Sequence, residues 1–204
     1  MAKLVQLRRR LGGVEGNRSL TTWTAIVLLV LLPVELLTLL ALGPLLPVHV
    51  FVGMLLVPLV TLKLASVTYR LWRYYARSPA YVAAGAPALL LRLLGPFVVA
   101  TTLVLLGSGV ALVVLGPGTP FVLTAHKASF ILWAGAMGLH VLGHLRDVVA
   151  VPTAWLRRNR LEGRATRGIA IGASVLAGLV LATTTLHLAD RWEDGGRSEQ
   201  HEVR

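Results

Sequence analysis

Long apolar runs separated by short basic blocks limit most strongly what this chain can fold into. Of its 204 residues, 55% are hydrophobic and 14% are charged, whereas soluble domains carry about 25% charged residues. Within lipid, every backbone polar group needs an internal partner, which helices provide. The sequence therefore predicts an all-α integral membrane protein, a bundle of five transmembrane helices of about 20 residues each. The predicted spans run from Thr22 to Leu42, Val48 to Tyr69, Leu93 to Leu115, Leu123 to Val149 and Gly168 to Leu188.

The distribution of basic residues predicts how these helices are oriented. Arginines cluster before the first span, between the second and third, and between the fourth and fifth, whereas the loops 43–47 and 116–124 contain no Lys or Arg. By the positive-inside rule, the N-terminus is cytoplasmic in a multi-pass protein of the cell (plasma) membrane. Residues 1–21 form a basic cytoplasmic segment, 22–188 the membrane domain, and 189–204 a polar extracytoplasmic tail. The first apolar run resembles a signal peptide but is longer than usual, so we interpret it as a retained helix.

Composition and motifs exclude several classes of function. The net charge of +11 is spread over blocks that flank the apolar runs, which favours contact with the lipid bilayer and predicts no nucleic-acid partner. The chain has no cysteine, so disulfides, thiolate-bound iron–sulfur clusters and covalently attached haem are excluded. No nucleotide-binding or zinc-protease motif is present, and the sequence shows no internal repeat.

Four ionisable side chains are spaced in pairs on two of the predicted spans. His49 and Lys63 are fourteen residues apart, and so are His126 and His140. Fourteen residues are close to four helical turns, so each pair lies on one helix face about 21 Å apart. With both helices running inward from the outer side, His49 and His126 share the outer depth, and Lys63 and His140 share the inner depth. Ionisable groups inside a membrane are costly and usually functional.

Imidazole is a common axial ligand of haem iron, and helical bundles often hold cofactors between facing helices. The spacing therefore predicts a haem between His49 and His126. A helix packed against a flat haem needs small residues, and Gly53 and Gly109 lie on the relevant helices. Glycine is also frequent in membrane helices for close packing alone, so these glycines discriminate weakly between the two interpretations.

The segments from His49 through Lys63 and from His126 through His140 resemble the haem-bearing helix pair of membrane b-type cytochromes, including cytochrome b and b561-like proteins. In those families, two helices each carry two histidines fourteen residues apart, and the four histidines bind two stacked haems. The resemblance covers roughly Val48–Leu145, within a predicted haem-bearing core of about residues 48–149. It implies that His49 and His126 bind an outer haem b and that His140 contributes a metal ligand to an inner one. It also implies an electron-transfer subunit that exchanges electrons with quinone and with an extracytoplasmic redox protein.

Lys63 is the departure from that pattern. A lysine binds iron only when it is deprotonated, and it can instead extend toward the interface or pair with a haem propionate. We therefore expect one haem b. A second haem is possible if His140, or His144 one turn further along, pairs with another axial ligand.

Two further residues keep alternatives open. Glu35, two residues after Pro33, is either a proton or quinone site or a buried acid that caps carbonyl groups freed by the proline. His187 is either an interfacial histidine or a replacement ligand. The alternative function is a haem-free small membrane transporter or a structural or assembly subunit of a membrane complex. No substrate-transforming site is visible, so we expect no catalysis by the chain alone.

Overall fold

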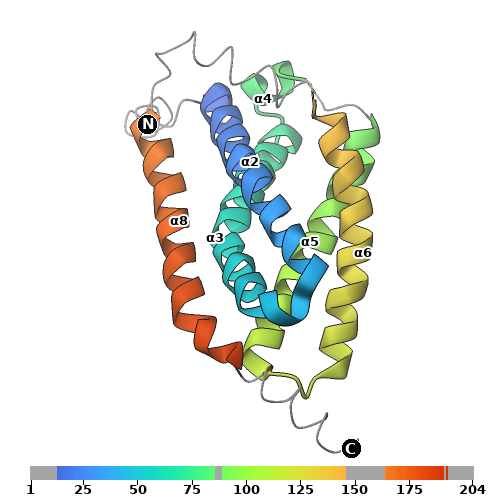
Figure 1. Cartoon of the computed structure of the whole chain (residues 1–204). Helices are drawn as coiled ribbons and strands as arrows, with labels where there is room; N and C mark the ends of the chain where they lie inside the picture. The colour runs from blue at the N-terminus through green and yellow to red at the C-terminus, as the bar shows by residue number, and fades with distance from the viewer. Residues whose placement is uncertain (1–12, 86–88, 146–163, 191, 193–204) are drawn as a thin grey trace, which may run out of the picture.

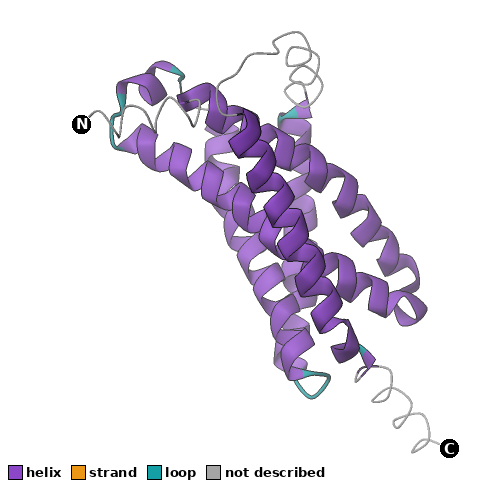
Figure 2. Cartoon of the chain, turned by 90° about the vertical axis from the view of Figure 1, so that its left-hand side faces the viewer, coloured by secondary structure: helices purple, strands orange, loops and turns teal. Residues whose placement is uncertain are grey.

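The described part of the chain is helical throughout. The computed structural model describes residues 13–85, 89–145, 164–190 and 192, and these contain helices and connecting turns but no strand (Figure 2). The elements are α2 (Gly13–Thr38), η1 (Leu39–Ala41), α3 (Leu42–Tyr75), α4 (Pro79–Ala83), α5 (Leu89–Leu115), α6 (Pro120–Gly143), α8 (Arg164–Thr185) and η2 (Leu186–Leu188).

Four helical stretches among these residues are long and apolar enough to cross a membrane. They are Gly13–Tyr75, Arg92–Leu115, Pro120–Leu145 and Arg164–Leu188. The first comprises α2, η1 and α3, and Figure 1 shows that α2 and α3 lie side by side and run in opposite directions. The all-α architecture is therefore confirmed for the described residues, which contain four candidate membrane spans, and the count of five spans stays a prediction. The predicted end of the fourth span at Val149 lies outside the described residues, as does most of the polar tail.

The chain reverses direction between α2 and α3 earlier than the sequence predicts. We expected the first span to end at Leu42 and the second to begin at Val48, whereas α2 ends at Thr38 and α3 begins at Leu42. The helix breaks at Ala41, whose φ of −145° and ψ of 59° are not helical. Pro44 then lies in the first turn of α3, where a proline needs no backbone N–H. Gly43 and Pro44, which suggested a loop in the sequence, therefore lie inside helix α3.

The end of α3 is a Schellman motif. The backbone N–H of Ser78 donates to the carbonyl of Arg73 over 3.1 Å, and that of Arg77 donates to Tyr74 over 3.0 Å. The motif requires a left-handed residue, usually glycine. Here Arg77 adopts it, with a φ of 51°. By contrast, α5 is followed by Gly116 with a φ of 83°, the residue type that tolerates this conformation.

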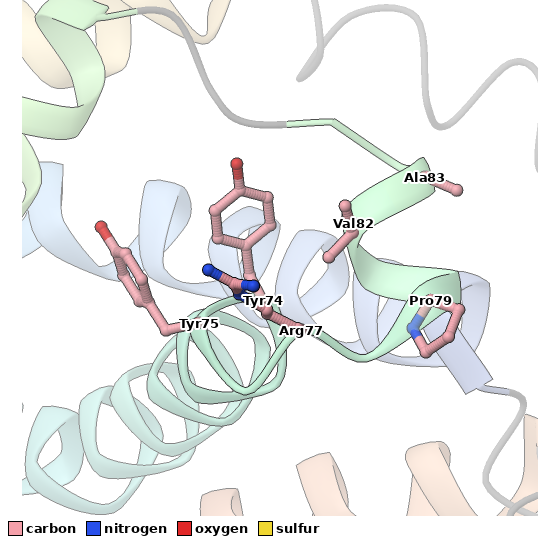
Figure 3. Close-up of a pocket in the computed structure, with 6 residues that line it drawn as sticks. All are labelled: Tyr74, Tyr75, Arg77, Pro79, Val82 and Ala83. Atoms are coloured by element: carbon pink, nitrogen blue, oxygen red, sulfur yellow. The ribbon is translucent and has the colours of Figure 1, made fainter.

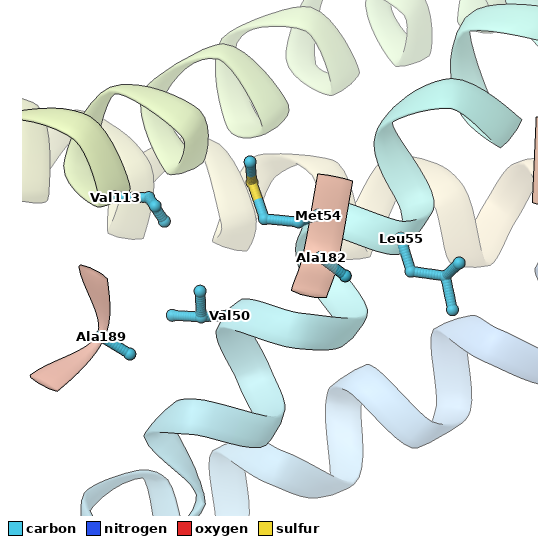
Figure 4. Close-up of a cluster of buried hydrophobic side chains, with 6 residues drawn as sticks. All are labelled: Val50, Met54, Leu55, Val113, Ala182 and Ala189. Carbon is cyan, nitrogen blue, oxygen red and sulfur yellow. The ribbon is translucent and has the colours of Figure 1, made fainter. Parts of the chain in front are cut away.

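Helix α3 is the centre of the packing. It packs most extensively against α2 and α8, while α5 packs mainly against α6. Figure 4 shows one buried cluster, formed by Val50, Met54, Leu55, Val113, Ala182 and Ala189. Gly178 of α8 brings that helix close to α3, because a Cβ at this position would lie 2.6 Å from the carbonyl oxygen of Leu55. The absence of a side chain on Gly178 therefore sets the distance between these two helices.

The outer surface of the bundle is apolar. Leu40 and Phe121 are 82% and 83% exposed, and large apolar side chains are exposed along every long helix. A soluble monomer rarely exposes so much contiguous apolar surface. This surface is suited to lipid.

Candidate functional site

The sequence-predicted histidines His49 and His126 meet at one end of the bundle. His49 lies near the start of α3, close to the last turn of α2, and His126 lies in the second turn of α6, beside α5. Figure 1 shows that this end carries η1 and the turn between α5 and α6. The two imidazoles are half-buried and come from the two halves of the bundle.

His49 is held through its Nδ1 atom by two groups of α2. Nδ1 lies 2.9 Å from Oγ1 of Thr38 and 3.1 Å from Oε1 of Glu35. The Thr38 hydroxyl donates its only hydrogen to the backbone carbonyl of Glu35, so toward His49 it must accept. Nδ1 of His49 therefore carries the proton and donates to both oxygens. In the neutral ring this leaves the lone pair on Nε2.

His126 is held in the same way by α5. Its Nδ1 lies 3.1 Å from the carbonyl oxygen of Leu105 and 3.1 Å from Oγ of Ser108. A carbonyl can only accept, and the Ser108 hydroxyl donates to the carbonyl groups of Val104 and Leu105. Nδ1 of His126 is therefore also the protonated nitrogen. Neither Nε2 makes a hydrogen bond within the described part of the chain, so both rings offer a lone pair there.

The distance between the two rings suits a shared metal ion. The ring centres lie 6.4 Å apart, and the ring planes are inclined at 84°. Two imidazoles on opposite sides of one metal, at metal–nitrogen distances of about 2 Å, would place their ring centres roughly 6 Å apart. A metal-bound histidine almost always donates its other N–H to a carboxylate or backbone carbonyl, as both rings do here. The two imidazoles are therefore spaced at a distance compatible with one shared metal ion.

The space around the pair is arranged by glycine and by helix spacing. A Cβ on Gly109 would lie 3.1 Å from Cε1 of His126, and one on Gly53 would lie 3.3 Å from Oε1 of Glu35. The two glycines thus make room for the His126 ring and for the acid that holds His49. Helices α3 and α6 are not among the pairs that pack extensively in the described residues, which leaves the two histidine-bearing helices apart.

Lys63, at the inner depth, links α3 to α2 through a hydrogen bond. Its Nζ donates to the carbonyl of Thr21 over 2.7 Å. Beside it, the hydroxyls of Thr21 and Ser66 are 2.8 Å apart, and the side chain of Asn17 donates to the carbonyl of Ser66 over 3.1 Å. This polar cluster gives Lys63 a structural partner on α2 and does not direct its amine at a ring of α6.

The inner histidines lie together without pairing to α3. The rings of His140 and His144 are 4.8 Å apart, and Nδ1 of His140 is buried with no hydrogen-bond partner. Lys63 is close enough to His140 for an electrostatic interaction. The described residues contain no group of three or more His, Cys, Asp or Glu that could hold a metal ion. The inner end thus offers imidazoles but no opposed pair like the outer one.

Sequence reasoning missed the groups that orient the outer histidines. Thr38, Ser108 and the Leu105 carbonyl were not singled out, although Thr38 precedes His49 by 11 residues. Ser and Thr are common in membrane helices, so only the packing of α2 on α3 and of α5 on α6 identifies these two as partners of the histidines. Glu35 was singled out, and the structure places it against His49.

Comparison with known proteins adds no relative to this picture: no family model, curated protein or solved structure matches the chain.

Proposed function

We propose that this protein is a b-type cytochrome subunit that binds one haem b between His49 of α3 and His126 of α6. The observation that carries the proposal is the pair of imidazoles 6.4 Å apart, each held through a protonated Nδ1. When bound, haem supplies a one-electron carrier whose potential the protein tunes. The chain's own residues would orient the two rings, keep their Nε2 lone pairs available, and surround the cofactor with apolar helices.

The proposed transmembrane topology places this site near the outer face of the membrane. The hairpin of α2 and α3 would make two passes, which with α5, α6 and α8 gives five, with a cytoplasmic N-terminus. Arg73, Arg77 and Arg92 then lie on the cytoplasmic side, and the turn between α5 and α6, which carries no basic residue, lies outside. A haem at that depth would carry electrons between the quinone pool and an extracytoplasmic redox partner, as an electron-transfer subunit of an oxidoreductase complex.

The test is an absorption spectrum of the detergent-purified chain, reduced minus oxidised, with haem quantified as its pyridine adduct. We expect a b-type band and about one haem per chain. His49→Ala and His126→Ala should each abolish the band while the protein still inserts. His187→Ala, in η2, tests the alternative in which this histidine is a replacement ligand, and it should leave the band unchanged. A band retained in either site variant would contradict the pairing.

A haem-free transporter or structural subunit is the second candidate. The observation that favours it is a set of buried polar atoms without partners, which includes Oδ1 of Asn17, Oε2 of Glu35 and Nδ1 of His140. Such atoms would also line a polar path through the bundle. Colour separates the two proposals, because a transporter purified from a haem-sufficient host would be colourless and would respond to none of the histidine substitutions in the visible spectrum.

A further inference from the structure

A cavity of about 560 Å³ lies where the first apolar stretch ends. It is lined by Tyr74, Tyr75, Arg77, Pro79, Val82 and Ala83. Tyr75 is the last residue of the stretch Gly13–Tyr75, so this cavity lies at one end of that stretch. Figure 3 shows the side chain of Arg77 beside Tyr74, with Pro79, Val82 and Ala83 of α4 on the other side.

The backbone at Arg77 indicates that its side chain is retained at a cost. Arg77 occupies the left-handed position of the Schellman motif, with a φ of 51°, where glycine is the unstrained choice. Backbone strain at such a position points to a functional constraint on the side chain. Arg77 is one of the residues that line the cavity, and a glycine in its place would leave the lining without a charged side chain.

Arg77 is the one basic residue among the six that line this cavity. The side chain of Arg77 has no hydrogen-bond or ion-pair partner in the described part of the chain. The neighbouring Arg73 is engaged, because it donates to Oγ of Ser78 over 2.7 Å and lies 5.6 Å from the centre of the Tyr81 ring. Burial raises the pKa of the Tyr81 phenol, so this tyrosine stays neutral near pH 7. No carboxylate lines the cavity, which therefore has a net positive charge.

We propose that this cavity binds the phosphate headgroup of an anionic phospholipid. Arginine recognises phosphate through paired N–H donors, and the phenol groups of Tyr74 and Tyr75 add donors at the level where tyrosine is enriched in membrane proteins. Pro79, Val82 and Ala83 provide an apolar wall beside the start of the acyl chains. The site is independent of haem, since it lies at the opposite end of α3 from His49.

The test is lipid retention in nanodiscs of phosphatidylcholine containing a minority of phosphatidylglycerol, measured by native mass spectrometry of the full chain. Wild type should retain phosphatidylglycerol selectively. Arg77→Gly removes the charge and places a glycine in the left-handed conformation, so this variant should fold. Its retention of phosphatidylglycerol should fall roughly five-fold, the effect of one arginine near an anionic surface. Arg77→Lys should keep part of the selectivity. Arg92→Gln is the matched control, because Arg92 is exposed near the start of α5 and does not line the cavity.

Equal retention by wild type and Arg77→Gly would overturn the proposal. An equal loss in Arg92→Gln would also overturn it, because net charge alone would then explain the binding. Inorganic phosphate added to the nanodiscs distinguishes the two sources of the same chemistry. If phosphate leaves the bound lipid in place, the lipid is the ligand, whereas displacement of the lipid by phosphate would show that the site takes the free anion instead.

Discussion

At the scale of single residues, the outer histidines show how a hydroxyl fixes the state of an imidazole. Thr38 and Ser108 each place their single hydrogen on a backbone carbonyl of their own helix. They can then only accept from Nδ1 of His49 and His126. The choice of tautomer is made by helices α2 and α5, before any cofactor binds. This preorganisation supports the assignment of both Nε2 atoms as ligands.

Glu35 should tune the proposed haem, because its Oε1 lies 3.1 Å from Nδ1 of His49. A carboxylate acceptor increases the basicity of a ligand imidazole more than an amide does. We expect Glu35→Gln to raise the haem midpoint potential and Glu35→Ala to weaken haem binding by roughly 10- to 100-fold. Redox titration followed at the α-band measures the first, and haem titration of the apoprotein measures the second.

Glu15→Gln is the control for Glu35, since it removes a carboxylate from the other end of the same helix. This variant should leave the midpoint potential at the wild-type value. An unchanged potential in Glu35→Gln, with haem still bound, would show that the contact with His49 does not reach the iron.

Replacing Arg77 by glycine should stabilise the protein while it weakens the proposed lipid site. A non-glycine residue in the left-handed region costs roughly 1–2 kcal/mol, and Arg77 has a φ of 51°. Arg77→Gly should therefore raise the free energy of unfolding by about 1 kcal/mol. Denaturant titration of the detergent-solubilised protein measures this. A destabilised Arg77→Gly would mean that contacts of the arginine side chain outweigh the backbone strain.

At the scale of helices, the close approach of α8 to α3 depends on one glycine. A Cβ at Gly178 would lie 2.6 Å from the Leu55 carbonyl oxygen and 2.9 Å from its Cδ1. Backbone cannot move aside as a flexible side chain can, so the two helices would separate. We expect Gly178→Ala to destabilise the protein by about 1–3 kcal/mol, the usual cost of overpacking, measured by thermal unfolding in detergent.

Gly172 provides the matched control on the same helix. A Cβ there meets nothing within 4 Å, so Gly172→Ala should be neutral or stabilising by about 0.5–1 kcal/mol through helix propensity alone. Equal effects of the two substitutions would show that the contact between Gly178 and Leu55 does not set the helix packing.

Apolar composition alone was enough to predict that the long helices exist, but it did not predict where all of them end. The run that became α5 needed only its length and its lack of charge, and its predicted end at Leu115 is confirmed. The ends of α2 and α3 were not predictable, because Pro44 is tolerated in a first helical turn and the break falls at Ala41, an ordinary residue.

The candidate site was predictable only in part, for the same physical reason. The predicted orientation of the two helices, together with the fourteen-residue spacing on each, predicted that His49 and His126 share one depth. Which nitrogen each ring exposes depends on Thr38, Glu35, Leu105 and Ser108, which lie on neighbouring helices. Such contacts follow from packing between elements, and no periodicity within one segment contains them.

At the scale of the whole molecule, charge and apolar surface together predict the topology. Figure 1 places α4, the start of α5 and the start of α8 at one end of the bundle and the turn between α5 and α6 at the other. Arg77 and Arg92 belong to the first end, and residues 116–124 at the second carry no basic residue. On the positive-inside rule, we propose that the first end is cytoplasmic. An odd number of passes would further put the two termini on opposite sides.

The absence of cysteine makes this topology directly testable with single engineered thiols. Ala84→Cys and Gly118→Cys are both exposed and lie at opposite ends. A membrane-impermeant maleimide added to intact cells should label Gly118→Cys, and it should label Ala84→Cys only after permeabilisation. If the proposed five passes separate the termini, Ala2→Cys should be labelled like Ala84→Cys, and Ser198→Cys should be labelled like Gly118→Cys. Labelling of both termini from the same side would reduce the count to an even number, and labelling of Ala84→Cys in intact cells would invert the bundle and place the His49–His126 pair at the cytoplasmic face.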